Sequence, residues 1–407
     1  MDLSHMTEFG ISKTPQKEFD ARLARMWKEI ESAHLDGMVF FSSASITYLT
    51  GSPLVATERP MALVCTPNGG LVMLVPRLEY EHAQMQLPQC CIVCYPEYPG
   101  KRHPMYFLGN LLQELGLAQG ALGADSDGYP PVYGYSGPSL SQVLGREDLA
   151  FFPRLIQKLK VCKSEYELSL IRESARWSNY ALALLQEYTK PGLREFDVSF
   201  QAGNDAARTM LKTLGGRYHP NSLSDCGVWV GYRGQVGVDS YYPHAVTTNA
   251  QFRRGDLLGC YASGDVGGYI CELERNFFMG PPSEEQRKYY QLVVELQETA
   301  LEALRPGVRC CDVDAAVQKF YQKHHLEDAW RHHTGHSLGS GMHECPVLDI
   351  GDETEVQPGM CFSVEPGLYI KGVGGFRLSD TVAVHQNGIE RVTYYSRDIE
   401  SLICGWE

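Results

Sequence analysis

The pattern of apolar residues changes at about residue 155, and this change constrains the fold of the 407-residue chain more than any other feature. Before it, short apolar runs such as DGMVFFSS and LVMLVP alternate with helical stretches, which predicts an α/β N-terminal domain over residues 1–155. An amphipathic stretch from Ser164 to Thr189 then predicts one long helix. Residues 156–407 group strands and helices in separate runs, which is typical of an α+β domain with an antiparallel sheet covered by helices.

The composition excludes several classes of partner. The formal net charge is -13 and no run of lysine or arginine stands out, so neither a nucleic acid nor an anionic membrane surface is expected. No stretch reaches the roughly 18 apolar residues that a membrane span needs, and the first residues lack the apolar core of a secretory signal. Thirteen cysteines, many of them single among apolar residues, favour a reduced compartment. We therefore expect a cytoplasmic protein that acts on small molecules or peptides.

Four stretches of the second half carry more histidine, glutamate and glycine than a core needs. They are YYPHAVTTNAQFRRGD with His244, GYICELERNFF with Glu272 and Glu274, HHTGHSLGSGMHECP with His336 and His343, and PGMCFSVEPGLY followed by GGFRLSD, with Glu365 and Arg377. Taken singly, a strand glutamate is most often solvated, and a histidine after proline most often lies at the surface. Because a strand alternates its faces, however, the two glutamates of GYICELERNFF point to the same side.

In order and spacing, these stretches resemble the creatinase, prolidase and Xaa-Pro aminopeptidase family (M24), whose catalytic domain has the pita-bread fold. The resemblance covers nearly the whole chain, including KSEYELSLIRESA, TGHSLG and VQPGMCFSVEPGLY. The peptidases of that family hold two divalent metals through two aspartates, one histidine and two glutamates. Carried over to this chain, the histidine is His336 and the first glutamate is Glu365, whereas Tyr261, Glu272 and Ser379 stand at the other three positions. With both bridging carboxylates replaced, the resemblance implies loss of the metal pair.

The departures resemble the metal-free creatinase branch. Its LER motif is present with Glu274, His244 stands at the place of its catalytic histidine, and Arg59 stands where a substrate carboxylate is held. This resemblance implies a metal-independent hydrolase, without a cofactor, that cleaves a C–N bond in a small zwitterionic guanidino, amidino or amide carboxylate. The expected catalytic residues are His244, Glu274, Glu365 and His336, and the expected substrate-binding residues are Arg59, Glu272, Tyr261, His343 and Arg377.

The chemistry of these residues is also consistent with hydrolysis of a cationic or zwitterionic substrate. A histidine with a near-neutral pKa can take a proton from water and return it to a leaving nitrogen, and carboxylates suit a cationic guanidinium. Three neighbouring carboxylates, Glu272, Glu274 and Glu365, cannot all stay ionised without a cation among them. We therefore expect either a cationic substrate or one protonated glutamate. The branch also consists of homodimers, so the resemblance implies that Arg59 acts across a subunit interface.

Two alternatives stay open. The first is a residual Xaa-Pro metallopeptidase with one metal on Glu272, His336 and Glu365, because three protein ligands can hold a catalytic metal and leave a position open. The second is a catalytically silent protein that uses the old pocket for recognition.

Overall fold

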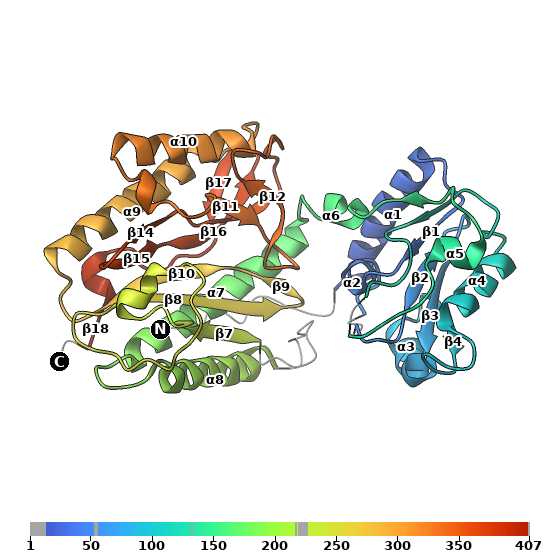
Figure 1. Cartoon of the computed structure of the whole chain (residues 1–407), viewed down its shortest axis with the longest axis horizontal. Helices are drawn as coiled ribbons and strands as arrows, with labels where there is room; N and C mark the ends of the chain where they lie inside the picture. Colours follow the sequence, from blue (N-terminus) through green and yellow to red (C-terminus); the bar gives the residue numbers. More distant parts are fainter. Residues whose placement is uncertain (1–13, 53–55, 132, 216–217, 219–226, 406–407) are drawn as a thin grey trace. The chain divides into compact units, whose positions relative to one another are not determined.

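The chain divides into two compact units, and the boundary between them in the described sequence lies between Lys160 and Val161. The computed structural model describes residues 14–52, 56–131, 133–215, 218 and 227–405 (Figure 1). Among these residues, no helix is long and apolar enough to cross a membrane. The twelve cysteines among them are all free thiols.

The first unit is an α/β domain built on a six-stranded sheet with the order β4-β3-β2-β1-β5-β6. The strands are β1 (Gly37–Phe40), β2 (Ala62–Cys65), β3 (Leu71–Pro76), β4 (Cys91–Tyr95), β5 (Leu122–Ala124) and β6 (Ala150–Phe151). The β1/β2 and β2/β3 pairs are antiparallel, whereas β3/β4, β1/β5 and β5/β6 are parallel. The helices are α1 (Gln16–Ser32), α2 (Ser43–Thr50), α3 (Tyr80–Gln86), α4 (Pro104–Glu114), α5 (Leu140–Leu144) and α6 (Leu155–Leu159).

The second unit is built on a curved ten-stranded sheet whose main path runs β12-β11-β13-β16-β10-β8-β7. Three short strands pair with it at its sides, and β14 and β15 form a separate hairpin. All pairs in the main path are antiparallel. The strands are β7 (Val228–Gly231), β8 (Leu257–Val266), β9 (Tyr269–Ile270), β10 (Leu273–Met279), β11 (Gly335–Ser337), β12 (Glu344–Leu348), β13 (Cys361–Val364), β14 (Gly367–Ile370), β15 (Gly374–Arg377), β16 (Ser379–His385), β17 (Gly388–Arg391) and β18 (Ile403–Cys404).

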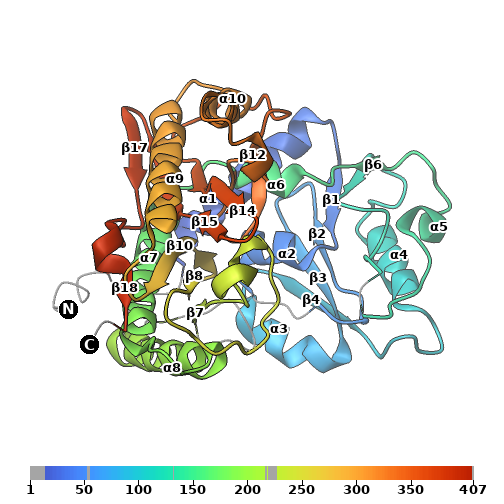
Figure 2. The same cartoon turned by 60° about the vertical axis from the view of Figure 1, so that its left-hand side comes forward.

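Four helices pack against this sheet, and Figure 2 shows α7, α8 and α9 along one side of it. They are α7 (Glu165–Tyr188), α8 (Glu195–Leu214), α9 (Glu284–Ala303) and α10 (Cys310–Lys323). Trp177 of α7, Val293 of α9 and Phe277 of β10 belong to one continuous apolar core and are fully buried. The expected pita-bread architecture is confirmed, and the opposite face of the sheet is left for polar side chains.

The predicted long helix is α7, and its start follows from local chemistry. The Ser164 side chain accepts a hydrogen bond from the Glu167 amide, and the Glu167 carboxylate accepts one from the Ser164 amide at 2.7 Å. This reciprocal pair satisfies two amides that the first helical turn leaves without partners. In the GVWVGYRGQVGV stretch, Val228–Gly231 forms a strand and a turn follows it.

Arg275 of the GYICELERNFF stretch is a structural residue. Its fully buried guanidinium pairs with Asp380 of β16 at 2.8 Å and donates to four carbonyl groups, those of Glu274, Ser379, Tyr395 and Ser396. These contacts use the donors of a buried cation completely, which is the condition under which such a charge is tolerated. Arg275 therefore ties β10 to β16 from the side of the sheet opposite Glu274.

Candidate functional site

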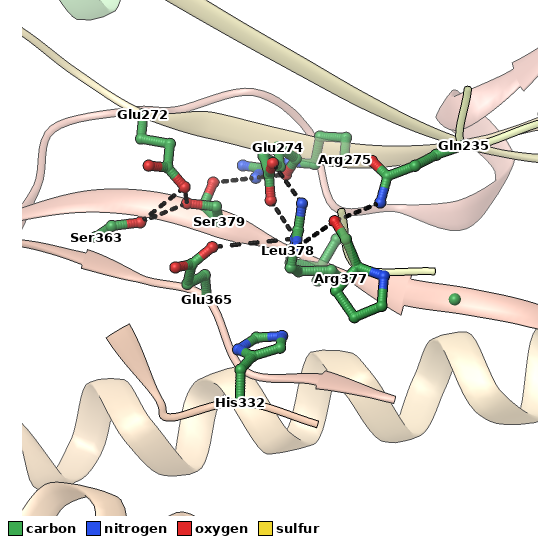
Figure 3. Close-up of polar contacts among 12 residues, drawn as sticks. Gln235, Glu272, Glu274, Arg275, His332, Ser363, Glu365, Arg377, Leu378 and Ser379 are labelled. Carbon is green, nitrogen blue, oxygen red and sulfur yellow. Dashed lines mark hydrogen bonds and ion pairs between the residues drawn. The ribbon is translucent and has the colours of Figure 1, made fainter. Parts of the chain in front are cut away.

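Strand alternation brings the glutamates of GYICELERNFF to one cavity, as the sequence predicts. Glu272 precedes β10 and Glu274 lies within it, and both line a cavity of about 460 Å³ together with Glu365, which follows β13. Glu274 lies opposite Tyr261 of β8 on one side and Ser379 of β16 on the other. Figure 3 shows Glu272 and Glu274, from the β10 segment, together with Glu365, which follows β13.

His336 of β11 lies between two of these carboxylates. Its Nε2 atom is 3.2 Å from Glu365 Oε1 and 3.6 Å from Glu272 Oε2, while Nδ1 lies 3.1 Å from the Ser337 carbonyl oxygen. Nε2 is buried and has no hydrogen-bond partner among the residues that the structure describes. The His343 ring stacks on the His336 ring with 3.8 Å between centroids. An unpartnered, buried nitrogen aimed at two carboxylates is a site prepared for a cation.

Burial and mutual charge shift the pKa values of this trio strongly. Burial, reinforced by the Glu365 charge, raises the pKa of Glu272 to about 8. Burial would lower the pKa of His336, but Glu365 and Glu272 outweigh it and raise this pKa to about 9. Burial would also raise the pKa of Glu365, yet His336 and Arg377 hold it below its ordinary range. Near pH 7 the trio therefore holds a protonated Glu272, a cationic His336 and an ionised Glu365.

Two serine hydroxyls complete the surroundings of Glu272. Ser363 and Ser379 each donate to Glu272 Oε1 at 3.2 Å, and their own oxygens are 2.7 Å apart (Figure 3). Ser379 stands where the resemblance placed a second metal-binding glutamate. Its hydroxyl cannot replace the charge of a bridging carboxylate, and in this structure it orients Glu272 instead.

Glu274 is paired with two arginines of the protein. Arg377 donates to Oε1 from Nη2 at 2.6 Å and to Oε2 from Nε, and Arg233 donates to Oε1 from Nη2 at 2.7 Å. The Arg233 guanidinium also lies over the Tyr261 ring, 4.5 Å from its centroid. The expectation of either a cationic substrate or one protonated glutamate did not include these two arginines, which balance the charge of Glu274.

The other predicted site residues are only partly brought together. His244, Tyr261, His343 and Arg377 line the same cavity as the glutamates. Arg59, in contrast, belongs to the first unit, where it pairs with Glu97 at 2.7 Å and with Glu58. Its substrate-binding role and the roles of the other predicted residues stay predictions.

The sequence analysis did not predict three residues of the site: Arg233 and His332, which line the cavity, and Ser363, which donates to Glu272. The Nε2 atom of His332 lies 2.8 Å from the Tyr369 hydroxyl. Arg233 lies in a turn and has a φ of 50°. No local sequence pattern predicts its contact with Glu274, which lies 41 positions later in the chain. Ser363 could have been found from its strand, because β13 pairs with both β11 and β16.

Two groups of side chains could each hold a cation: Glu272 with His336 and His343, and Glu272 with Glu274 and Glu365. A metal about 2.1 Å from each ligand atom in tetrahedral geometry sets the ligand atoms about 3.4 Å apart. The distances of 3.2 and 3.6 Å from His336 Nε2 to the two carboxylates lie on either side of this value. Glu272, His336 and His343 also converge within 4.8 Å. Glu274 is occupied by its arginines, and Tyr261 and Ser379 supply no carboxylate for a second ion.

Comparison with known proteins identifies the family. Residues 169–386 match the model of metallopeptidase family M24, and residues 22–160 match the creatinase/prolidase N-terminal domain. The chain therefore belongs to the metallopeptidase family M24.

Individual relatives span almost the whole chain. An Xaa-Pro dipeptidase of Pyrococcus furiosus is 27% identical over 93% of this chain and 99% of its own length. A creatinase of a Bacillus species is 24% identical over 93% of this chain and 91% of its own. The crystal structure of an Xaa-Pro dipeptidase from Bacillus anthracis superposes with a TM-score of 0.79 at 22% identity, covering 95% of this chain and 99% of that one.

These comparisons correct the function expected from the sequence. The prediction of a metal-independent hydrolase acting on a non-peptide C–N bond is wrong, because the family is one of metallopeptidases and its relatives here include Xaa-Pro dipeptidases over nearly full length. The features that favoured creatinase have another physical explanation. Glu274 of the LER motif binds Arg233 and Arg377.

Proposed function

We propose that this protein is a single-metal hydrolase that cleaves dipeptides of the Xaa-Pro type. The observation that carries the proposal is the buried His336 Nε2, which lacks a hydrogen-bond partner and faces Glu272 and Glu365 at ligand-to-ligand distances. The names of the family relatives support the substrate class. We assign Glu272, His336 and Glu365 as the residues that would hold the ion, with His343 adjacent.

A bound divalent ion would supply a water of lowered pKa and polarise the peptide carbonyl group. The residues of the chain supply the remaining tasks. Ser363 and Ser379 fix Glu272 in place, and the pair of arginines keeps Glu274 away from the ion. His244 and His343 line the exposed part of the cavity, where an imidazole can take a proton from water or give one to the leaving nitrogen.

A dipeptide also satisfies the expectation of a small zwitterionic substrate, because it carries an ammonium and a carboxylate. The guanidinium of Arg331 lines the cavity and can pair with the substrate carboxylate. A homodimer in which Arg59 acts in the partner's site remains part of the proposal and rests on the resemblance. A cytoplasmic location remains part of it as well, supported by the free thiols.

Metal content and turnover test the proposal together. Dialysis against Mn²⁺, Co²⁺ or Zn²⁺ should leave a single ion per chain, and hydrolysis of Ala-Pro should disappear with chelator and return with metal. His336→Ala should lose both, whereas the control His82→Ala, an exposed histidine of the first unit, should lose neither. Two ions per chain, or hydrolysis that survives chelation, would contradict the single-metal site. Dipeptide binding without turnover would instead identify a silent binding protein.

A further inference from the structure

A second cavity of about 370 Å³ adjoins the first one and is lined mainly by residues of α8 and β7. Figure 1 shows where these two elements lie. Two residues, Arg233 and Tyr261, line both cavities. The side chain of Arg233 is 40% exposed and Tyr261 is only partly buried, so this pair borders both spaces without being sealed in. The two cavities are therefore neighbours across one stacked pair of side chains.

The walls of the second cavity differ chemically from those of the first. Phe196 and Phe200 of α8 contribute rings whose centroids are 4.7 Å apart and which are 43% and 58% exposed. Trp229 and Val230 of β7 line the cavity as well, and Gly203 leaves it open on the helix side. The first cavity is lined mainly by glutamates, arginines and histidines.

The turn that carries Arg233 is held firmly. The buried Glu195 carboxylate accepts hydrogen bonds from the Gly234 amide at 2.8 Å, the Thr247 hydroxyl at 2.7 Å and the Thr248 amide at 3.0 Å. Gly234 has a φ of 78°, and a Cβ there would lie 2.2 Å from the Val246 carbonyl oxygen. Arg233 is thus fixed at the boundary of the two cavities while its guanidinium pairs with Glu274.

From this arrangement we infer that the second cavity is a specificity pocket for an aromatic or branched apolar side chain of the substrate. The inference rests on the proposed function, because the rest of the substrate would lie in the first cavity. The ring or branched chain would pack against the Phe196 and Phe200 rings and Trp229. The shared Arg233 and Tyr261 would flank the bond that leads from one cavity to the other.

Amide probes test the pocket independently of any reaction. N-acetylphenylalaninamide should bind the full-length protein at least about tenfold more tightly than N-acetylalaninamide, because a buried ring gains apolar contact area. Gly203→Leu should abolish this preference, since a Cβ at Gly203 meets only Val230 Cγ1, at 3.8 Å, and a longer side chain extends into the cavity. The matched control Arg208→Leu, on the exposed face of the same helix, should keep the preference.

Two further measurements keep the inference falsifiable. Phe200→Ala removes one ring from the wall and should reduce the preference even if Gly203→Leu does not fold. With dipeptides, kcat/KM for Phe-Pro relative to Ala-Pro should fall in the same variants. Equal binding of the two amides, or a preference that survives both substitutions, would overturn the pocket. A preference for the phenylalanine amide without hydrolysis of either dipeptide would overturn the proposed function and leave the pocket standing.

Discussion

At the scale of single residues, Glu272 and Glu274 show how two carboxylates on one face of a strand acquire opposite properties. Glu274 accepts from two guanidinium groups and is held as an anion. Among the described residues, the Glu272 carboxylate accepts hydrogen bonds only from the hydroxyls of Ser363 and Ser379. Burial and the Glu365 charge raise its pKa to about 8. Substitution of glutamine for each glutamate should therefore affect the free energy of unfolding differently at the two positions.

Glu274→Gln should lower the free energy of unfolding by roughly 2 to 4 kcal/mol, since removing one partner of a buried ion pair leaves the other charge uncompensated. The substitution does not relieve repulsion among the carboxylates, because Arg233 and Arg377 already compensate the charge of Glu274. Urea unfolding at pH 7 measures the change, with Glu147→Gln, an exposed position, as the control. An unchanged free energy would mean that the arginines find other partners.

Glu272→Gln should leave the free energy of unfolding of the metal-free protein nearly unchanged at pH 7, because the carboxyl group it replaces is already protonated there. The same variant should lose its metal, since an amide is a poor ligand for a divalent ion in place of a carboxylate. Urea unfolding after chelation and metal analysis after dialysis separate the two effects. Retention of a stoichiometric ion would remove Glu272 from the ligand set.

At the scale of elements, the sequence predicts what depends on local pattern and misses what depends on turns. The α7 boundaries follow from a capping serine, and the common direction of Glu272 and Glu274 follows from the two-residue period of a strand. The contact of Arg233 with Glu274 was not predicted, because Arg233 lies in a left-handed turn after β7. The side chain of a turn residue can reach across the sheet, but a turn has no periodic sequence pattern from which this contact could be predicted.

The contact between α7 and β17 gives a pH-dependent prediction. Arg172 donates to Glu390 from Nη2 at 2.8 Å and from Nε at 3.0 Å, and it holds the pKa of Glu390 below its ordinary range. Because the pKa of Glu390 is lower in the folded state, its ionised form stabilises the fold at pH values above the unfolded-state pKa of about 4.3. This stabilisation is lost as the pH falls through the folded-state pKa. The pair is partly exposed, which limits its contribution.

Arg172→Met should accordingly lower the free energy of unfolding by about 0.5 to 1 kcal/mol at pH 7 and by little at pH 3. Urea unfolding curves of the variant and the parent at both pH values measure the difference. A loss of the same size at pH 3 would show that Arg172 acts through packing of its methylene groups.

At the scale of the whole molecule, every proposed metal ligand lies in the second unit, while the first unit has its own sheet and its own apolar clusters. Adding metal should therefore raise the unfolding temperature of the second unit alone, because a ligand stabilises only the structure that binds it. Calorimetry of the full-length protein with and without metal should show two transitions, of which one shifts. A joint shift of both would indicate that the units unfold together.

The row of residues that crosses the sheet at Tyr261, Glu274 and Ser379 has a consequence for the history of the protein. Tyr261 supports Arg233, Arg233 neutralises Glu274, and Ser379 orients Glu272, so each residue is useful only beside the others. Ser379→Glu alone would crowd a further anion against Glu272, and Tyr261→Asp alone would remove the ring beneath a guanidinium. Evolution between this centre and one that holds two ions must then cross intermediates of reduced fitness, so laboratory selection should recover the exchange only when these positions are varied together.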